Sequence, residues 1–85
     1  MNKVVMYCTD SCQYCQKAEK LLKKKGVVID KINIEGNKSK IKEMLKRSKR
    51  NTVPQIFIGD KHIGGFDDLA ELEVIGRLDK ILKRN

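Results

Sequence analysis

The sequence lacks any long apolar run. Every apolar stretch meets a polar residue far short of the roughly 20 residues that a membrane-spanning helix needs. The N-terminal "MNKVVMYCTD" has an apolar stretch too short for the hydrophobic region of a secretory signal peptide. We therefore expect a soluble cytoplasmic protein that has no membrane partner.

Aromatic residues are also scarce: there is no tryptophan, and there are only two tyrosines and two phenylalanines. Base-stacking aromatics and a base-reading motif are what identify most nucleic-acid binders, and neither is evident here. The net charge of +8 is therefore interpreted mainly as solvated helix faces, with attraction of anionic partners as the alternative. No nucleic-acid partner is expected, and a basic nucleic-acid module remains a distant alternative.

There is a single histidine, His62, and this limits the metal sites that the chain can build. Together with Cys8, Cys12 and Cys15 it could nominally supply four zinc ligands. However, no second ligand lies beside it in the sequence, and zinc sites usually pair a CxxC with another close pair. No metal site is predicted, and His62 is interpreted as an ordinary strand or surface residue.

All three cysteines lie within "YCTDSCQYC". An odd number argues against a framework of structural disulfides, and clustered cysteines in a cytosolic protein indicate catalysis or metal binding. The spacing CxxxCxxC is the one with which radical S-adenosylmethionine enzymes hold an iron–sulfur cluster. Those enzymes need a large α/β barrel, which 85 residues cannot form. The other interpretation is a dithiol redox site, CQYC.

Hydrophobic patterns predict one α/β domain over residues 1–85, with the element order β-α-β-α-β-β-α and no repeats or linkers. A right-handed crossover should make the first two strands parallel, and a short turn should make the last two an antiparallel hairpin. The strands are expected over 3–8, 27–34 and 54–59, with a fourth short strand in "DKHIGG" at 60–65. The helices are expected from Cys15 to a stop at Gly26, around 41–48, and over 66–82 with an interruption at Gly76.

In this order Cys12 lies just before the first helix and Cys15 lies in its first turn. Unpaired N–H groups and the helix dipole favour a negative sulfur there, and thiolate is the nucleophilic form of cysteine. A gap of two residues lets Cys15 reach back to Cys12 and close a disulfide after a mixed disulfide has formed. The pattern of strand, loop, CxxC and helix therefore predicts thiol–disulfide chemistry.

Three motifs, "CQYC" at 12–15, "TVPQIFIG" at 52–59 and "GGFDDL" at 64–69, resemble the glutaredoxin family, specifically its small bacterial dithiol members. The resemblance covers essentially the whole chain. It implies a thioredoxin-like fold, with a four-stranded mixed sheet flanked by helices. It also implies a glutathione-dependent enzyme that reduces protein disulfides and protein–glutathione mixed disulfides, and thereby serves redox homeostasis and electron transport.

The resemblance further assigns roles to residues. Cys12 is the exposed nucleophile, Cys15 is the buried resolving thiol, and the two form the redox-active disulfide. Glutathione is a co-substrate, no tightly bound cofactor is expected, and the protein is expected to be a monomer. A glutathione-binding groove is implied, with a cis peptide bond before Pro54 and the wall residues Tyr14, Thr52, Val53, Pro54, Gly65, Phe66 and Asp67.

Within this groove the resemblance implies that the Val53 backbone receives the cysteine part of glutathione. Gly65, Phe66 and Asp67 would hold the γ-glutamyl end. Helix-start N–H groups suit its carboxylate, and the Asp67 side chain suits its ammonium. Asp67 and Asp68 can alternatively be plain N-capping residues.

The chain departs from the family pattern in and around the active-site motif. Gln13 stands where proline is usual, which leaves the redox potential open. Thr9 stands where many relatives carry a lysine that would favour the thiolate and the glycyl carboxylate of glutathione. Lys40, Lys42 and Arg47 are the candidates to replace that charge.

Two further departures are Lys49, which replaces a glycine and is interpreted as a surface change, and Cys8, which replaces threonine or serine. Cys8 is interpreted as a small half-buried residue at a strand end. The alternative is a third redox thiol that traps glutathione or forms an off-pathway disulfide with Cys12.

Two other functions remain open from the sequence. Thioredoxin is the nearest enzyme, but its motif is CGPC. An iron–sulfur carrier would hold a [2Fe–2S] cluster with the Cys12 thiolates of two subunits and two glutathiones. An active-site proline disfavours such a cluster, and Gln13 removes that obstacle.

Overall fold

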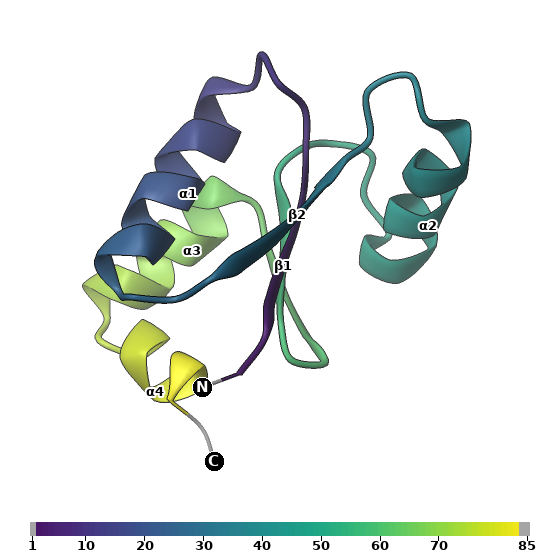
Figure 1. Ribbon diagram of the computed structural model, residues 1–85. Coiled ribbons are helices and arrows are strands. Elements are labelled where there is room, and N and C mark those ends of the chain that lie inside the picture. Colours follow the sequence, from purple (N-terminus) through teal and green to yellow (C-terminus); the bar gives the residue numbers. More distant parts are fainter. Residues whose placement is uncertain (1, 84–85) are drawn as a thin grey trace.

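The computed structural model describes residues 2–83 and contains the predicted alternation of strands and helices (Figure 1). The predicted interruption at Gly76 is confirmed, since the helix from Phe66 ends before it and a separate short helix follows. The elements are β1 (Val4–Cys8), α1 (Gln13–Lys24), β2 (Ile29–Asn33), α2 (Lys38–Ser48), β3 (Gln55–Ile58), β4 (Lys61–Gly64), α3 (Phe66–Val74) and α4 (Leu78–Leu82).

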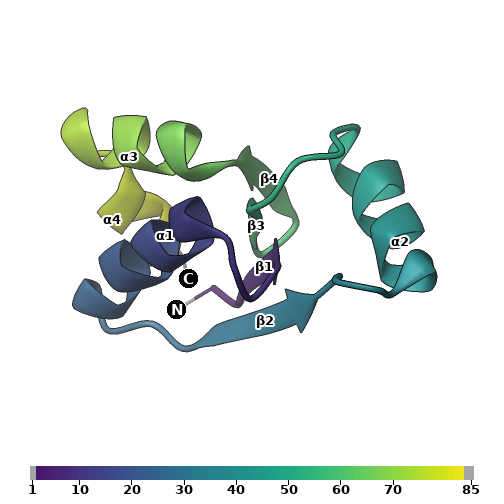
Figure 2. The same ribbon diagram turned by 90° about the horizontal axis from the view of Figure 1, so that it is seen from above.

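The four strands form one mixed sheet in the order β2-β1-β3-β4. β1 runs parallel to β2 and antiparallel to β3, and β3 pairs with β4 as an antiparallel hairpin. Helices α1, α3 and α4 lie on one face of the sheet and α2 lies on the other (Figure 2). The predicted mixed sheet, its strand directions and the thioredoxin-like fold are thus confirmed.

Alternating side chains of the central strand β1 serve two separate cores, because successive residues of a strand point to opposite faces. Met6 packs with Leu22 and Leu69 on the side of α1 and α3. Tyr7 packs with Met44 and other apolar residues on the side of α2. The sheet therefore carries helices on both faces, and the ends of its strands remain available for a site.

Polar contacts also fasten α2 to the sheet. The Tyr7 hydroxyl donates to Glu43 and accepts a hydrogen bond of 2.7 Å from Arg47 Nη1. Burial and the hydrogen bond to Glu43 raise the pKa of Tyr7, so it stays a neutral donor at physiological pH. The Arg47 guanidinium also lies over the Phe57 ring, 4.1 Å from its centre.

The end of α2 shows a feature that the sequence interpretation did not include. Lys49 is exposed, as predicted, but it adopts the left-handed conformation with φ 63° and ψ 20°. Its N–H donates to the Leu45 carbonyl at 2.8 Å and so closes the helix. Glycine usually occupies this position because a Cβ atom is unfavourable there.

Replacing Lys49 with glycine is therefore expected to stabilise the protein by about 1 kcal/mol, measured as the free energy of unfolding in urea. The matched control is Lys46→Gly inside the same helix, which should destabilise by about 1 kcal/mol because glycine is a poor helix former. An equal loss of stability in both variants would contradict the role of the left-handed conformation.

None of the helices found in residues 2–83 has both the length and the apolar character needed to cross a membrane.

Candidate active site

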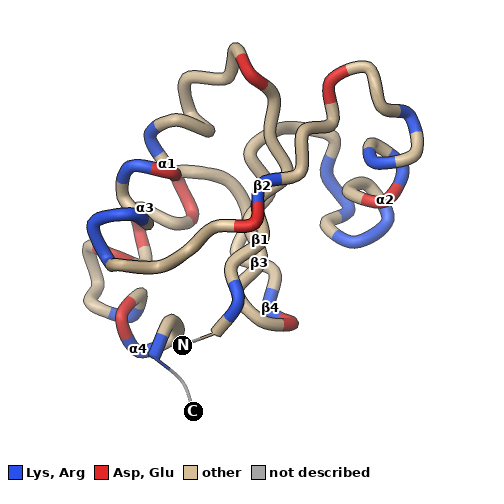
Figure 3. The backbone as a smooth tube through the Cα atoms, viewed as in Figure 1, with Lys and Arg blue, Asp and Glu red and all other residues tan. Residues whose placement is uncertain are grey.

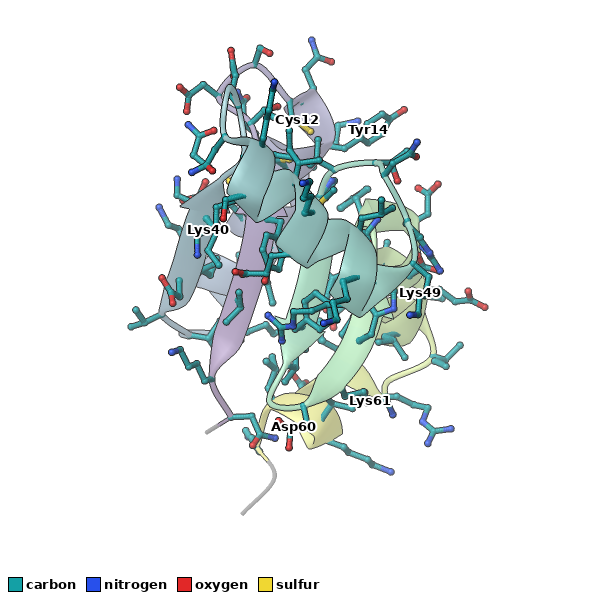
Figure 4. The ribbon with its side chains drawn as sticks, turned by 90° about the vertical axis from the view of Figure 1, so that its right-hand side faces the viewer. Cys12, Tyr14, Lys40, Lys49, Asp60 and Lys61 are labelled. Atoms are coloured by element: carbon teal, nitrogen blue, oxygen red, sulfur yellow. The ribbon has the colours of Figure 1, made fainter. Side chains whose placement is uncertain are left out.

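The loop between β1 and α1 places Cys12 at the N-cap of α1, with φ −83° and ψ 112°. Its sulfur accepts a hydrogen bond of 3.1 Å from the Cys15 backbone N–H, and it lies 3.8 Å from the Val53 carbonyl oxygen. Cys12 is partly exposed at the same end of the molecule as Tyr14 (Figure 4). The Cys12 sulfur therefore lies where the N–H groups and the dipole of a helix start stabilise negative charge.

Cys15 lies one helical turn further on and faces the core, with only 4% of its surface exposed. Burial and a hydrogen bond with Cys12 raise the pKa of Cys15 to about 12. At neutral pH its thiol therefore stays protonated, because the pH lies far below that pKa. Two chemically different thiols are thus held in hydrogen-bonding contact, one accessible and one inaccessible.

Cys8, the last residue of β1, is more deeply buried than predicted, with 8% of its surface exposed. Burial raises its pKa. Cys8 and Cys15 both belong to the core beneath α1, and both line a cavity of about 340 Å³ that also touches Glu19 and Lys31. The suggestion that Cys8 is a third redox thiol stays a prediction, and burial makes direct attack by Cys8 on a large substrate unfavourable.

A second cavity, of about 220 Å³, opens beside Cys12 and Val53. It is formed by the start of α1, the loop before β3 and the start of α3. Tyr14, which is 57% exposed, and Phe66 both line it, and the centres of their rings lie 6.4 Å apart. The Val53–Pro54 peptide bond is cis, as the resemblance implied. The structure brings together all seven predicted groove residues in its lining: Tyr14, Thr52, Val53, Pro54, Gly65, Phe66 and Asp67.

Two further residues, Arg50 and Asp68, line this groove and were not predicted to do so. Asp68 accepts hydrogen bonds from Arg50 Nη1 at 2.9 Å and from the Gly65 N–H at 3.0 Å. These contacts, led by the one with Arg50, hold the pKa of Asp68 below its usual value. Asp68 is therefore the residue that caps α3, while Asp67 lies exposed at the groove.

The predicted candidates for the missing lysine charge are Lys40, Lys42 and Arg47. None of them is among the groove-lining residues. Lys40 pairs with Glu43 at 3.2 Å, and Arg47 is engaged with Tyr7 and Phe57. The positive charge at the groove comes instead from Arg50. In the sequence, Arg50 is one member of the basic cluster "KRSKRN", and nothing in that cluster predicts that Arg50 lines the groove.

A buried amide supports the groove wall from behind. Gln55 is fully buried, and its Nε2 donates to the Thr52 carbonyl at 3.0 Å and to the Thr52 hydroxyl at 3.2 Å. Its Oε1 lies 2.8 Å from His62 Nε2. Burial, with the nearby charge of Arg50, lowers the pKa of His62, so it is neutral at physiological pH. His62 thus orients the Gln55 side chain, which in turn holds Thr52.

Within residues 2–83, no group of three or more His, Cys, Asp and Glu side chains is arranged to hold a metal ion. His62 in particular lies on β4 and is bonded to Gln55.

A thioredoxin-like fold that presents an accessible cysteine at a helix start, with a buried cysteine three residues later, defines a thiol–disulfide oxidoreductase. The family model described as Glutaredoxin matches residues 4–63. The chain belongs to the glutaredoxin family.

Individual relatives agree with this assignment. Glutaredoxin 3 of Escherichia coli K12 is 51% identical over 83 residues, which cover 98% of this chain and 100% of the relative. The solution structure of glutaredoxin from Brucella melitensis is 46% identical with a TM-score of 0.85, covering 98% of this chain and 90% of that one. The crystal structure of a buckwheat glutaredoxin–glutathione complex is 31% identical with a TM-score of 0.86, covering 95% and 76%.

Proposed function

We propose that this protein reduces protein disulfides and protein–glutathione mixed disulfides with glutathione as the electron donor, using Cys12 as nucleophile and Cys15 as resolving thiol. The observation that carries the proposal is the pairing of an accessible Cys12 at a helix start with a buried, protonated Cys15 beside the groove. The protein acts as a monomer in the cytoplasm, where a cellular reductase keeps glutathione reduced.

The first step is attack of the Cys12 thiolate on the glutathione sulfur of a mixed disulfide. A new bond joins Cys12 to glutathione, the old S–S bond breaks, and the substrate leaves as a thiolate that takes up a proton. The Cys15 N–H supports the negative sulfur before attack, at 3.1 Å. Exchange of this kind is fastest when the attacking thiol titrates near the ambient pH.

The second step releases glutathione. The thiolate of another glutathione attacks the sulfur of the bound glutathione, and oxidised glutathione and the Cys12 thiolate are formed. With a protein disulfide as substrate, Cys15 instead attacks the sulfur of Cys12 and passes its proton to the departing substrate thiolate. Two glutathiones then reduce the Cys12–Cys15 disulfide. The raised pKa of Cys15 keeps it from competing as the first nucleophile.

Glutathione binds in the groove beside Cys12. The Val53 backbone contacts the cysteine part of glutathione during exchange, and its carbonyl oxygen, 3.8 Å from the Cys12 sulfur, supports this. The start of α3 offers N–H groups to the γ-glutamyl carboxylate, and exposed Asp67 offers its carboxylate to the ammonium. The buckwheat relative forms a complex with glutathione, which supports this proposal.

The test compares wild type with Asp67→Asn in glutathione-coupled reduction of a glutathionylated peptide. Loss of the carboxylate charge is expected to raise KM for the mixed disulfide about tenfold with little change in kcat, because one charge-assisted contact is weakened. The matched control is Asp60→Asn in the β3–β4 turn, which should change neither constant. Equal rates with glutathione and with N-acetylcysteine in the wild type would contradict glutathione as the specific donor.

The same preparations test the iron–sulfur alternative. Protein purified without oxygen should be colourless under this proposal, whereas a brown colour with visible absorption would indicate cluster binding.

A further inference from the structure

The positive charge of the protein is concentrated around α2 (Figure 3). Residues 38–50 contain seven Lys or Arg and one acid, Glu43, so seven minus one leaves a net charge of +6 in this segment against +8 for the whole chain. Three of these basic residues have partners already described: Lys40 with Glu43, Arg47 with Tyr7, and Arg50 with Asp68.

The remaining four basic residues, Lys38, Lys42, Lys46 and Lys49, form what we name the α2 lysine stripe. The first three, four residues apart within α2, lie on one side of the helix, and Lys49 follows directly after its end. All four are exposed, and within residues 2–83 no carboxylate lies at ion-pair distance from any of them. Like charges four residues apart destabilise a helix, so the fold itself gains nothing from the stripe.

An apolar row runs beside the stripe. Ile41 and Leu45 are one turn apart, each immediately precedes a stripe lysine, and they are 37% and 46% exposed. The opposite side of α2 is covered by the sheet, where Met44 and Ser48 are buried. The outward side of α2 is therefore a surface with an apolar row and an uncompensated positive row.

This surface continues into the groove. α2 ends at Ser48, and Arg50, two residues later, already lines the groove. Val53, next to the Cys12 sulfur, packs against the same core as Met44 of α2. Cys12 and Tyr14 are both in sight when the molecule is viewed from the α2 side (Figure 4), although α1 and α2 lie on opposite faces of the sheet (Figure 2). A protein whose disulfide reaches Cys12 from this side lies against α2.

We propose that the outward side of α2 docks an acidic segment of the protein substrate, with carboxylates against the lysine stripe and apolar side chains over Ile41 and Leu45. This rests on the proposed function and names the substrate class that the site prefers. A membrane is a poorer fit, because the apolar side of α2 is already covered and two half-exposed side chains offer little area to insert. Nucleic acid would leave the apolar row unused.

The experiment uses two synthetic peptides that carry the same cysteine–glutathione mixed disulfide. One continues into a segment of glutamates and leucines, and in the other serines replace the glutamates. The test variant is Lys38→Gln, Lys42→Gln and Lys46→Gln combined. The control variant is Lys20→Gln, Lys24→Gln and Lys83→Gln combined, which removes the same charge from exposed lysines of α1 and the end of α4 on the other side of the sheet.

Wild type should turn over the acidic peptide with a kcat/KM about tenfold higher than the serine peptide at low salt, because opposite charges steer association. The α2 variant should lose this preference and its salt dependence, and the control variant should keep both. Replacing Ile41 and Leu45 with serine should lower kcat/KM for the acidic peptide and leave its salt dependence in place. The wild type, the α2 variant, the control variant and the variant at Ile41 and Leu45 should all turn over a small glutathione mixed disulfide at the same rate.

Equal kcat/KM values for both peptides in the wild type would overturn the docking proposal and leave the proposed function intact. Failure to turn over any glutathione mixed disulfide would instead overturn the proposed function. A third outcome is that wild type binds phosphatidylglycerol vesicles or an oligonucleotide, that the α2 variant does not, and that wild type shows no preference for the acidic peptide. This outcome would assign the stripe to another partner and contradict the proposal.

Discussion

Replacing Cys12 with serine is expected to lower the rate of glutathione-coupled reduction of hydroxyethyl disulfide about a thousandfold or more, because the covalent intermediate cannot form on an alcohol. No other thiol can take over. Cys15 and Cys8 are 4% and 8% exposed, and burial raises the pKa of both. Each therefore stays protonated at neutral pH and out of reach of a substrate disulfide.

Two matched variants, Cys15→Ser and Cys8→Ser, test the roles of the other two thiols. Cys15→Ser should still reduce glutathione mixed disulfides, since a second glutathione can release the first, but it should fail on protein disulfides that need the Cys12–Cys15 disulfide. Cys8→Ser should behave like wild type in both assays if Cys8 is silent. Full activity of the Cys12→Ser variant would remove the basis of the proposed mechanism.

Replacing Gly64 with alanine is expected to cost about 3 kcal/mol of unfolding free energy and to damage the groove. Gly64 has φ 117°, which side chains rarely adopt, and an added Cβ atom would overlap the Asp68 carboxylate and lie 3.0 Å from Arg50 Nη1. The ion pair between Arg50 and Asp68 and the cap of α3 would both have to move. Both the midpoint of urea unfolding and KM for a glutathione mixed disulfide should therefore change.

The control for this substitution is Gly76→Ala. Gly76 also has a positive φ, 75°, but an added Cβ atom would meet nothing within 4 Å. Its cost should be only about 1 kcal/mol, from the backbone conformation alone, and KM should not change. If the two variants lose the same stability and neither alters KM, the collision with Asp68 is not what makes Gly64 necessary.

The features that local sequence patterns determine were predictable. Apolar periodicity located the strands and helices, and the spacing of Cys12 and Cys15 at a helix start indicated the chemistry. The resemblance then named groove residues from three distant segments, and the structure places all seven in the lining of one cavity. These inferences need only the chain's own pattern and the order of its motifs.

The missed features depend on contacts between distant segments or on backbone angles. Arg50 meets Asp68 across 18 positions of sequence, and nothing in "KRSKRN" distinguishes it from its basic neighbours. Lys49 gives no sign in its residue type that it adopts a left-handed conformation. Cys8 is buried because α1 covers the end of β1, which the strand pattern alone does not reveal. Gln55 and His62 likewise meet only through the hairpin register.

The central claim, that Cys12 is the thiol that accepts glutathione, is tested most directly by trapping the intermediate. Cys15→Ser protein is incubated with oxidised glutathione and its intact mass is measured, followed by peptide mapping. We expect one glutathione per chain, attached to Cys12 and removed by reduced glutathione, because the resolving thiol is absent. Attachment at Cys8, or no attachment at all, would contradict the account.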